Sequence, residues 1–82
     1  MIQRTVGIID YGVGNHASVV QAVKTLGYLA TVSNDVDTLS KCDVLILPGV
    51  GSFTVAMTGL ERFGFINFLR RWAYEAHPMI GI

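Results

Sequence analysis

The residues best suited to chemistry are the glycines of Pro48-Gly49-Val50-Gly51-Ser52-Phe53, which directly follow the apolar run Val44–Leu47. Four apolar residues without polar alternation are typical of a strand buried on both faces of a parallel sheet. Pro48 has no N–H to donate and therefore ends the ladder of hydrogen bonds, while the glycines allow backbone conformations that side chains forbid. A glycine turn at the carboxyl end of a strand can aim backbone N–H groups at an anion or a developing oxyanion. The pattern predicts a site that acts through the backbone of residues 49–51.

Strand and helix patterns alternate through the rest of the chain and would bring this turn to one edge of a sheet. We expect strands at residues 5–9, 29–32, 44–47 and 79–82, and helices at residues 16–26, 37–41, 54–62 and 66–76. This alternation favours parallel strands joined by right-handed crossovers. We therefore expect an α/β fold, an open parallel sheet of flavodoxin-like order 2-1-3-4 with helices on both faces.

Apolar spacing predicts which helix faces pack on that sheet. The inward residues expected are Val19, Val20, Val23 and Leu26 in the first helix, Ala56, Met57 and Leu60 in the third, and Phe65, Leu69, Trp72, Ala73 and Ala76 in the last. Asn15 is a suitable N-cap for the first helix, and Gly27 a suitable stop. The last strand is apolar and the sequence ends inside it at Ile82. We expect residues 1–82 to be the N-terminal portion of a single larger domain.

Composition and charge exclude several classes of protein. The chain has 82 residues, is 51% hydrophobic and has six basic and six acidic residues, so its net charge is zero. A balanced charge gives no electrostatic footprint for nucleic acid or acidic membranes. No apolar stretch approaches the ~20 residues that span a bilayer, and no signal peptide is evident. Cys42 is the single cysteine, which fits a reducing compartment. We expect a soluble cytoplasmic protein.

Three segments resemble the class I glutamine amidotransferases, and among them the glutaminase subunits of imidazole glycerol phosphate synthases. They are Ile8–Asn15 (IIDYGVGN), Leu47–Phe53 (LPGVGSF) and Pro78–Ile82 (PMIGI). The resemblance covers the whole chain but only the first part of the family's domain. It implies the flavodoxin-like fold of this class, truncated within the fourth strand, and a glutamine amidotransferase activity for the parent protein.

The resemblance also implies which residues act. Gly49, Val50 and Gly51 would form the oxyanion strand, in which a peptide flip presents the Val50 N–H to the tetrahedral intermediate. In the family a nucleophilic cysteine follows the sequence Gly-Ile, so it would come immediately after Ile82, and a histidine and an acidic residue lie further along. The catalytic triad is absent from these 82 residues, and we expect the fragment to be inactive alone.

A partner is implied as well. In the family, ammonia from glutamine passes to a cyclase subunit with a (β/α)8 barrel, within a heterodimer of histidine biosynthesis. The loop from Tyr11 to Asn15 matches the part of the glutaminase subunit that lies against the cyclase, so Val13 and Asn15 are expected interface residues. We expect no cofactor.

Two other interpretations remain open. Gly12-Val13-Gly14-Asn15-His16-Ala17 fits the dinucleotide fingerprint G-x-G-x-x-G/A, and Asp35 lies about where a ribose-binding acid would be. Against this, Asp10 and Tyr11 separate the strand from the first glycine and put a carboxylate near the expected pyrophosphate. A small nucleotide-binding α/β module using Gly12 and Gly14 is the alternative function, and an inactive truncated product is the third possibility.

The remaining reactive side chains have simpler explanations. Cys42 precedes a strand and has no histidine near it in sequence, which indicates a partly buried thiol rather than a nucleophile. His16 is expected to be solvated or at an interface, and His77 lacks a second ligand nearby, so no metal site is predicted. Tyr11 would lie in the mouth of the sheet, where it could serve substrate, partner or packing.

Overall fold

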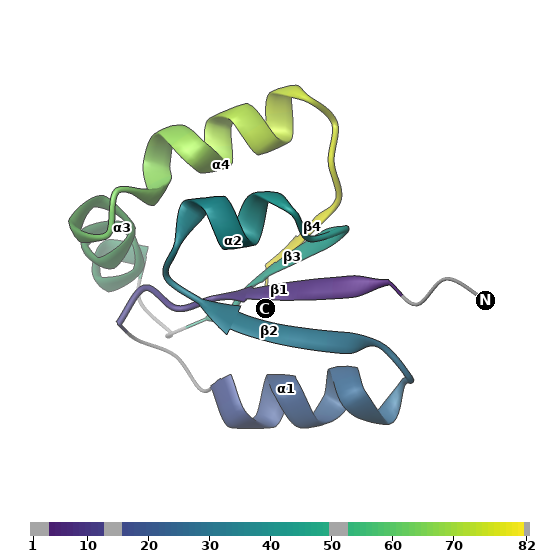
Figure 1. Cartoon of the computed structure of the whole chain (residues 1–82). Coiled ribbons are helices and arrows are strands. Elements are labelled where there is room, and N and C mark those ends of the chain that lie inside the picture. The colour runs from purple at the N-terminus through teal and green to yellow at the C-terminus, as the bar shows by residue number, and fades with distance from the viewer. Residues whose placement is uncertain (1–3, 13–15, 50–52, 82) are drawn as a thin grey trace.

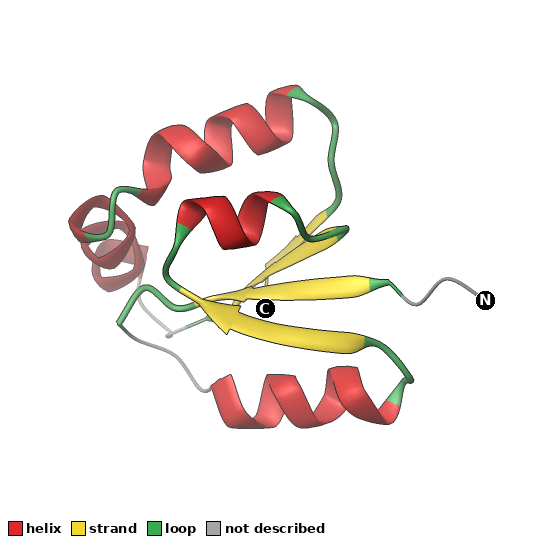
Figure 2. Cartoon of the chain, viewed as in Figure 1, coloured by secondary structure: helices red, strands yellow, loops and turns green. Residues whose placement is uncertain are grey.

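The described residues form a four-stranded parallel sheet with helices on both faces (Figures 1 and 2). The computed structural model describes residues 4–12, 16–49 and 53–81, with the backbone alone for residues 53–56. Its elements in chain order are β1 (Thr5–Ile9), α1 (His16–Thr25), β2 (Leu29–Ser33), α2 (Val36–Ser40), β3 (Val44–Leu47), α3 (Phe53–Arg62), α4 (Phe65–Tyr74) and β4 (Met79–Gly81). No helix in these ranges is long and apolar enough to cross a membrane.

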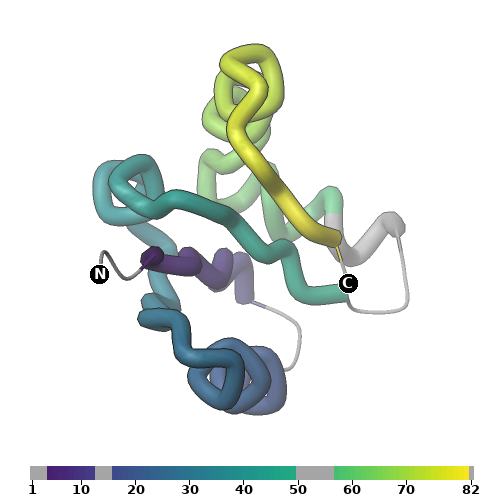
Figure 3. The backbone as a smooth tube through the Cα atoms, turned by 90° about the vertical axis from the view of Figure 1, so that its right-hand side faces the viewer, coloured from purple at the N-terminus to yellow at the C-terminus, as the bar shows by residue number. Residues whose placement is uncertain are grey.

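The strand order is β2-β1-β3-β4 and every pairing is parallel, which confirms the predicted order and fold class. Register places Ile8 of β1 opposite Ile46 of β3, and Leu47 of β3 opposite Gly81 of β4. Because parallel strands end at the same edge of a sheet, the residues after β1, β3 and β4 meet there. Figure 3 shows the yellow strand β4 ending beside the end of β3.

Alternation along the strands divides the core into two clusters. Val6 and Ile8 pack toward α1, in a cluster completed by Val23 and Ile46. The opposite face packs against α2, α3 and α4, and this larger cluster contains Ile9, Tyr11, Leu39, Cys42, Leu45, Leu60, Phe65, Phe68 and Trp72. Gly7 permits this packing, since a Cβ there would lie 2.8 Å from the Cys42 Sγ atom and 2.9 Å from Leu45 Cδ2.

Two predicted helix faces need correction. Leu26 was predicted to face the core, but α1 ends at Thr25 and the Leu26 side chain is 74% exposed. The helix closes with Gly27 at φ +89°, and the Gly27 and Tyr28 N–H groups donate to the Lys24 and Val23 carbonyls. This Schellman motif carries the chain away from the sheet at Leu26.

In α4 the buried stripe is Phe65, Phe68 and Trp72, whereas the predicted inward residues Ala73 and Ala76 are exposed. The stripe has i, i+3, i+7 spacing from the first residue of the helix, which turns Ala73 toward solvent. Ala76 lies beyond the helix at φ +59°, in the left-handed position of a second Schellman motif. The His77 and Ala76 N–H groups donate to the Trp72 and Ala73 carbonyls there.

The α1 face of the sheet carries an apolar hollow of ≈ 240 Å³ beside β4. Its lining residues are Arg4, Val6, Val23, Leu26, Tyr28, Val44, Ile46 and Ile80. Ile80 on β4 is 53% exposed, and Met79 next to it is 42% exposed. The helices among the described residues therefore leave the apolar side chains of β4 largely uncovered.

Candidate functional site

The carboxyl edge of the sheet brings together the segments after β1 and β3. Asp10 continues from β1, and its N–H donates to the Ser33 carbonyl at 2.9 Å. The Asp10 carboxylate accepts the Gly12 N–H at 3.1 Å and lies 3.8 Å from His16 Nε2 at the start of α1. Gly12 has φ +90°, a conformation that favours glycine. These contacts fix the first part of the loop that leads to α1.

Tyr11 is the side chain that joins the two strand ends. It is 1% exposed, and its hydroxyl donates to the carbonyl of Pro48, directly after β3. Burial raises the pKa of Tyr11, so the phenol is protonated at neutral pH. Helix α3 approaches from the other side, where a Cβ on Gly59 would lie 2.6 Å from the Tyr11 carbonyl oxygen and 2.9 Å from its ring. Tyr11 thus contacts the ends of two strands and a helix.

The predicted site residues are only partly within the described ranges. Pro48 is fully buried and Gly49 is exposed at the end of β3, at the sheet edge where the glycine turn was predicted. Val50 and Gly51 lie outside the described residues, and so do Val13, Gly14, Asn15 and Ile82. The oxyanion and interface roles of these residues stay predictions.

The loop geometry gives no support to the nucleotide-binding alternative. A phosphate-binding turn needs free backbone N–H groups and an environment without negative charge. The Gly12 N–H is already bonded to the Asp10 carboxylate, a negative charge beside the first glycine of the fingerprint.

Cys42 is a buried free thiol, and its burial was expected from its position in the sequence. It lies before β3, at the sheet edge opposite Gly49, and is 8% exposed. Its Sγ atom is 3.7 Å from the Thr38 carbonyl, and burial together with the Asp43 charge raises its pKa. A neutral buried thiol is a poor nucleophile. Among residues 4–12, 16–49 and 53–81, no group of three or more metal-binding side chains is found.

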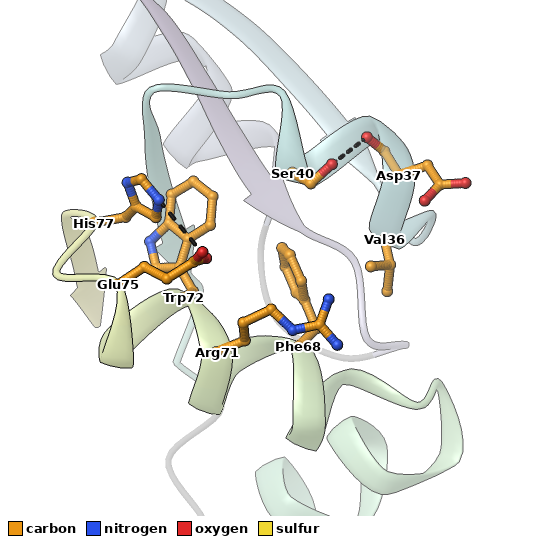
Figure 4. Close-up of a pocket in the computed structure, with 8 residues that line it drawn as sticks. All are labelled: Val36, Asp37, Ser40, Phe68, Arg71, Trp72, Glu75 and His77. Atoms are coloured by element: carbon orange, nitrogen blue, oxygen red, sulfur yellow. Dashed lines mark hydrogen bonds and ion pairs between the residues drawn. The ribbon is translucent and has the colours of Figure 1, made fainter.

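A second hollow of ≈ 270 Å³ lies between α2 and α4 (Figure 4), and sequence reasoning did not indicate it. It is lined by Val36, Asp37, Ser40, Phe68, Arg71, Trp72, Glu75 and His77. The His77 ring packs on Trp72 with ring centres 4.8 Å apart, and His77 Nε2 lies 3.8 Å from a Glu75 carboxylate oxygen. The Trp72 indole N–H donates to the Pro78 carbonyl at 2.9 Å. These contacts fix the connection from α4 to β4.

The parallel sheet of order β2-β1-β3-β4 has the flavodoxin-like architecture of class I glutamine amidotransferases. No protein-family model matches the chain. The chain is 46% identical over 77 residues to the imidazole glycerol phosphate synthase subunit HisH of Cutibacterium acnes, which covers 94% of the chain and 38% of that subunit. The chain is similar to the N-terminal part of HisH subunits.

Other relatives agree. The HisH subunit of Halalkalibacterium halodurans is 47% identical over 76 residues, covering 93% of the chain and 36% of the subunit. That of Aquifex aeolicus is 45% identical over 80 residues, covering 96% and 38% respectively. The chain therefore spans a little over a third of the length of the curated relatives it matches.

Proposed function

We propose that this chain is the N-terminal portion of the single amidotransferase domain of a cytoplasmic glutaminase, the subunit that supplies ammonia from glutamine to imidazole glycerol phosphate synthase. The observation that carries the proposal is the similarity to HisH subunits at 42–47% identity over 93–96% of the chain. The partner would be the cyclase subunit, a (β/α)8 barrel, in a heterodimer of histidine biosynthesis. Val13 and Asn15 would contribute to the interface with it.

Strand register supports the proposed place of the nucleophile. Leu47 pairs with Gly81, so continuing both strands by two residues puts position 83 opposite Gly49. Neighbouring strands lie about 4.8 Å apart, so a cysteine following Ile82 would emerge next to the glycine turn. In the proposed reaction its thiolate attacks the side-chain amide carbon of glutamine. Ammonia then leaves from the tetrahedral intermediate, and water hydrolyses the resulting thioester to glutamate.

The glycine turn would supply the electrostatic part of this reaction. Negative charge develops on the amide oxygen as the C–S bond forms, and a backbone N–H at hydrogen-bond distance stabilises it. We assign this donor to Val50, flanked by Gly49 and Gly51, whose lack of side chains permits the peptide to turn toward the substrate.

The uncovered apolar surface beside β4 supports the proposal that these residues are one portion of a larger domain. Ile80 and Leu26 are 53% and 74% exposed, and both line the hollow on the α1 face. A strand of a parallel sheet is normally covered on both faces. The matched region is only 36–39% of the relatives' length, so their remaining residues would be available to cover this surface.

The test uses a completed subunit, defined as residues 1–82 followed by their own continued reading frame or by the remaining part of the Cutibacterium acnes subunit. Combined with its cyclase, it is expected to release glutamate from glutamine, whereas residues 1–82 alone should release none above background. Val50→Pro removes the proposed donor and should lower kcat by about 10²–10³-fold, whereas Val50→Ala keeps the N–H and should act like wild type. Equal activity of the two variants would exclude Val50 as the donor.

A further inference from the structure

The hydrogen bond from Tyr11 to Pro48 holds the peptide that precedes the glycine turn. The accepting carbonyl belongs to the peptide unit joining Pro48 to Gly49. That unit is planar and trans, so its C=O and N–H point in opposite directions. Fixing the carbonyl against Tyr11 therefore fixes the direction of the Gly49 N–H and the orientation from which the turn begins.

The tyrosine itself has little freedom to move. Its ring belongs to the larger core cluster and its side chain is 1% exposed. Gly59 of α3 lies so close that a Cβ would be 2.9 Å from the ring. On the next residue, the Gly12 N–H is bound by the Asp10 carboxylate, and a Cβ there would lie 3.0 Å from the Phe63 ring. These contacts confine the Tyr11 side chain, so its hydroxyl has a fixed position at the end of β1.

Removal of the hydroxyl would free the Pro48 carbonyl. Pro48 is fully buried, so its carbonyl would lose its partner and would have to reorient to find another. Glycine is restricted in φ and ψ less than any other residue. A change of these angles at Gly49 would therefore reorient the peptide that follows it. The orientation of the Gly49 N–H, which belongs to the same peptide as the Pro48 carbonyl, would then no longer be set by the Tyr11 hydroxyl.

We propose that Tyr11 is a positioning residue for the glycine turn: its phenol anchors the Pro48–Gly49 peptide so that the next N–H meets the developing oxyanion. This inference rests on the proposed glutaminase function and adds a residue from the loop after β1 to the machinery after β3. Tyr11 does not touch the substrate in this assignment and acts through the backbone alone.

The experiment compares Tyr11→Phe with wild type in the completed subunit bound to its cyclase. Phenylalanine keeps the ring and its packing and removes only the donor. We expect kcat for glutamine hydrolysis to fall about 10- to 100-fold, while KM for glutamine stays within about twofold. The matched control is Tyr74→Phe on α4, where the side chain is 91% exposed and activity should not change.

Alkylation separates positioning from general structural damage. Iodoacetamide reacts with a nucleophilic cysteine without forming an oxyanion, so its rate with Tyr11→Phe should stay within about twofold of wild type. Replacing Tyr11 by 4-aminophenylalanine returns an N–H donor, and this variant should recover most of the lost kcat. It also provides the test if the phenylalanine variant does not fold.

Each outcome is decisive. Wild-type kcat in Tyr11→Phe, an equal loss of kcat and alkylation rate, or no recovery with 4-aminophenylalanine would overturn the role of Tyr11 while leaving the glutaminase function intact. An inactive wild-type completed subunit would instead overturn the proposed function, and the inference would fall with it.

Discussion

Gly59→Ala is expected to destabilise the protein, although the same change in most helices is stabilising. Gly59 lies inside α3, where alanine normally gains about 1 kcal/mol over glycine. Here the added Cβ would lie 2.6 Å from the Tyr11 carbonyl oxygen, whereas ordinary van der Waals contact begins at 3.4 Å. The blocking atom belongs to the backbone, so α3 or the segment after β1 must move to make room.

The size of the effect follows from two opposing terms. Forcing an extra methyl group into a packed core costs about 1–3 kcal/mol, and a backbone obstacle places the cost in the upper half of that range. The gain in helix propensity offsets about 1 kcal/mol of it. We expect a net loss of about 1–2 kcal/mol in the free energy of unfolding.

Urea denaturation of the completed subunit measures this loss as a lower midpoint at an unchanged slope. Asn67→Ala is the matched control, because Asn67 lies on the exposed side of α4 and should gain up to about 0.7 kcal/mol from propensity alone. If Gly59→Ala were as stable as wild type or more stable, the close packing of α3 on Tyr11 would be refuted, and with it the confinement of the tyrosine.

Two further predictions use the helix ends and the buried acids. Ala76→Gly should raise the free energy of unfolding by about 0.5–1 kcal/mol, because Ala76 has φ +59°, where glycine is favoured. Gly27→Ala, at the equivalent position after α1, should lower the free energy of unfolding by a similar amount. If urea denaturation showed that both variants change stability in the same direction, the left-handed helix ends would be contradicted. Stability should also fall as the pH rises from about 9, because burial raises the folded-state pKa values of Cys42 and Tyr11, so both groups ionise more readily in the unfolded chain. The contribution of these two groups to the free energy of unfolding is complete below their unfolded-state pKa values and is lost as the pH rises through their folded-state pKa values. The double variant Cys42→Ala with Tyr11→Phe should therefore lose less stability than wild type between pH 8 and 11.

Much of the fold could be predicted because a local sequence pattern indicates each strand. The run Val44–Leu47 has no polar alternation, and a parallel strand buried on both faces needs none. Alternating strands and helices favour a parallel sheet with right-handed crossovers, and the flavodoxin-like order 2-1-3-4 predicted for it is the order observed. Gly27 marked the end of α1 because a left-handed residue is needed there.

The mistakes have a common cause, which is that helix phase depends on where a helix begins and ends. Leu26 continues the apolar spacing of α1 in the sequence, but it lies in the Schellman motif that ends the helix, and its side chain is exposed. In α4 the buried stripe of Phe65, Phe68 and Trp72 turns Ala73 toward solvent, and Ala76 falls beyond the helix, in the second Schellman motif. An alanine in a left-handed position carries no sequence signal comparable to that of glycine.

The contact between Tyr11 and Pro48 is of another kind, because it joins residues 37 positions apart. Sequence placed Tyr11 in the mouth of the sheet but left its role open among substrate, partner and packing. The signal that could have found the contact was the predicted order itself. Order 2-1-3-4 makes the first and third strands neighbours, so the residues that follow them must meet.

The same reasoning makes the proposed chemistry depend on strand register as well as on the Tyr11 side chain. The first strand would contribute the Tyr11 anchor, the third the glycine turn, and the fourth the nucleophile that follows Ile82. Slipping β4 by one residue would move that nucleophile about 3.3 Å along the sheet and turn its side chain to the opposite face. The pairing of Leu47 with Gly81 would place position 83 opposite Gly49 if both strands continued. The connection in which the Trp72 indole N–H donates to the Pro78 carbonyl leads directly into this pairing. Trp72→Phe, which keeps the ring packing but removes the indole donor, should therefore lower glutaminase kcat in the completed subunit more than it lowers cyclase binding. An equal loss of both would indicate general destabilisation instead of a shifted register.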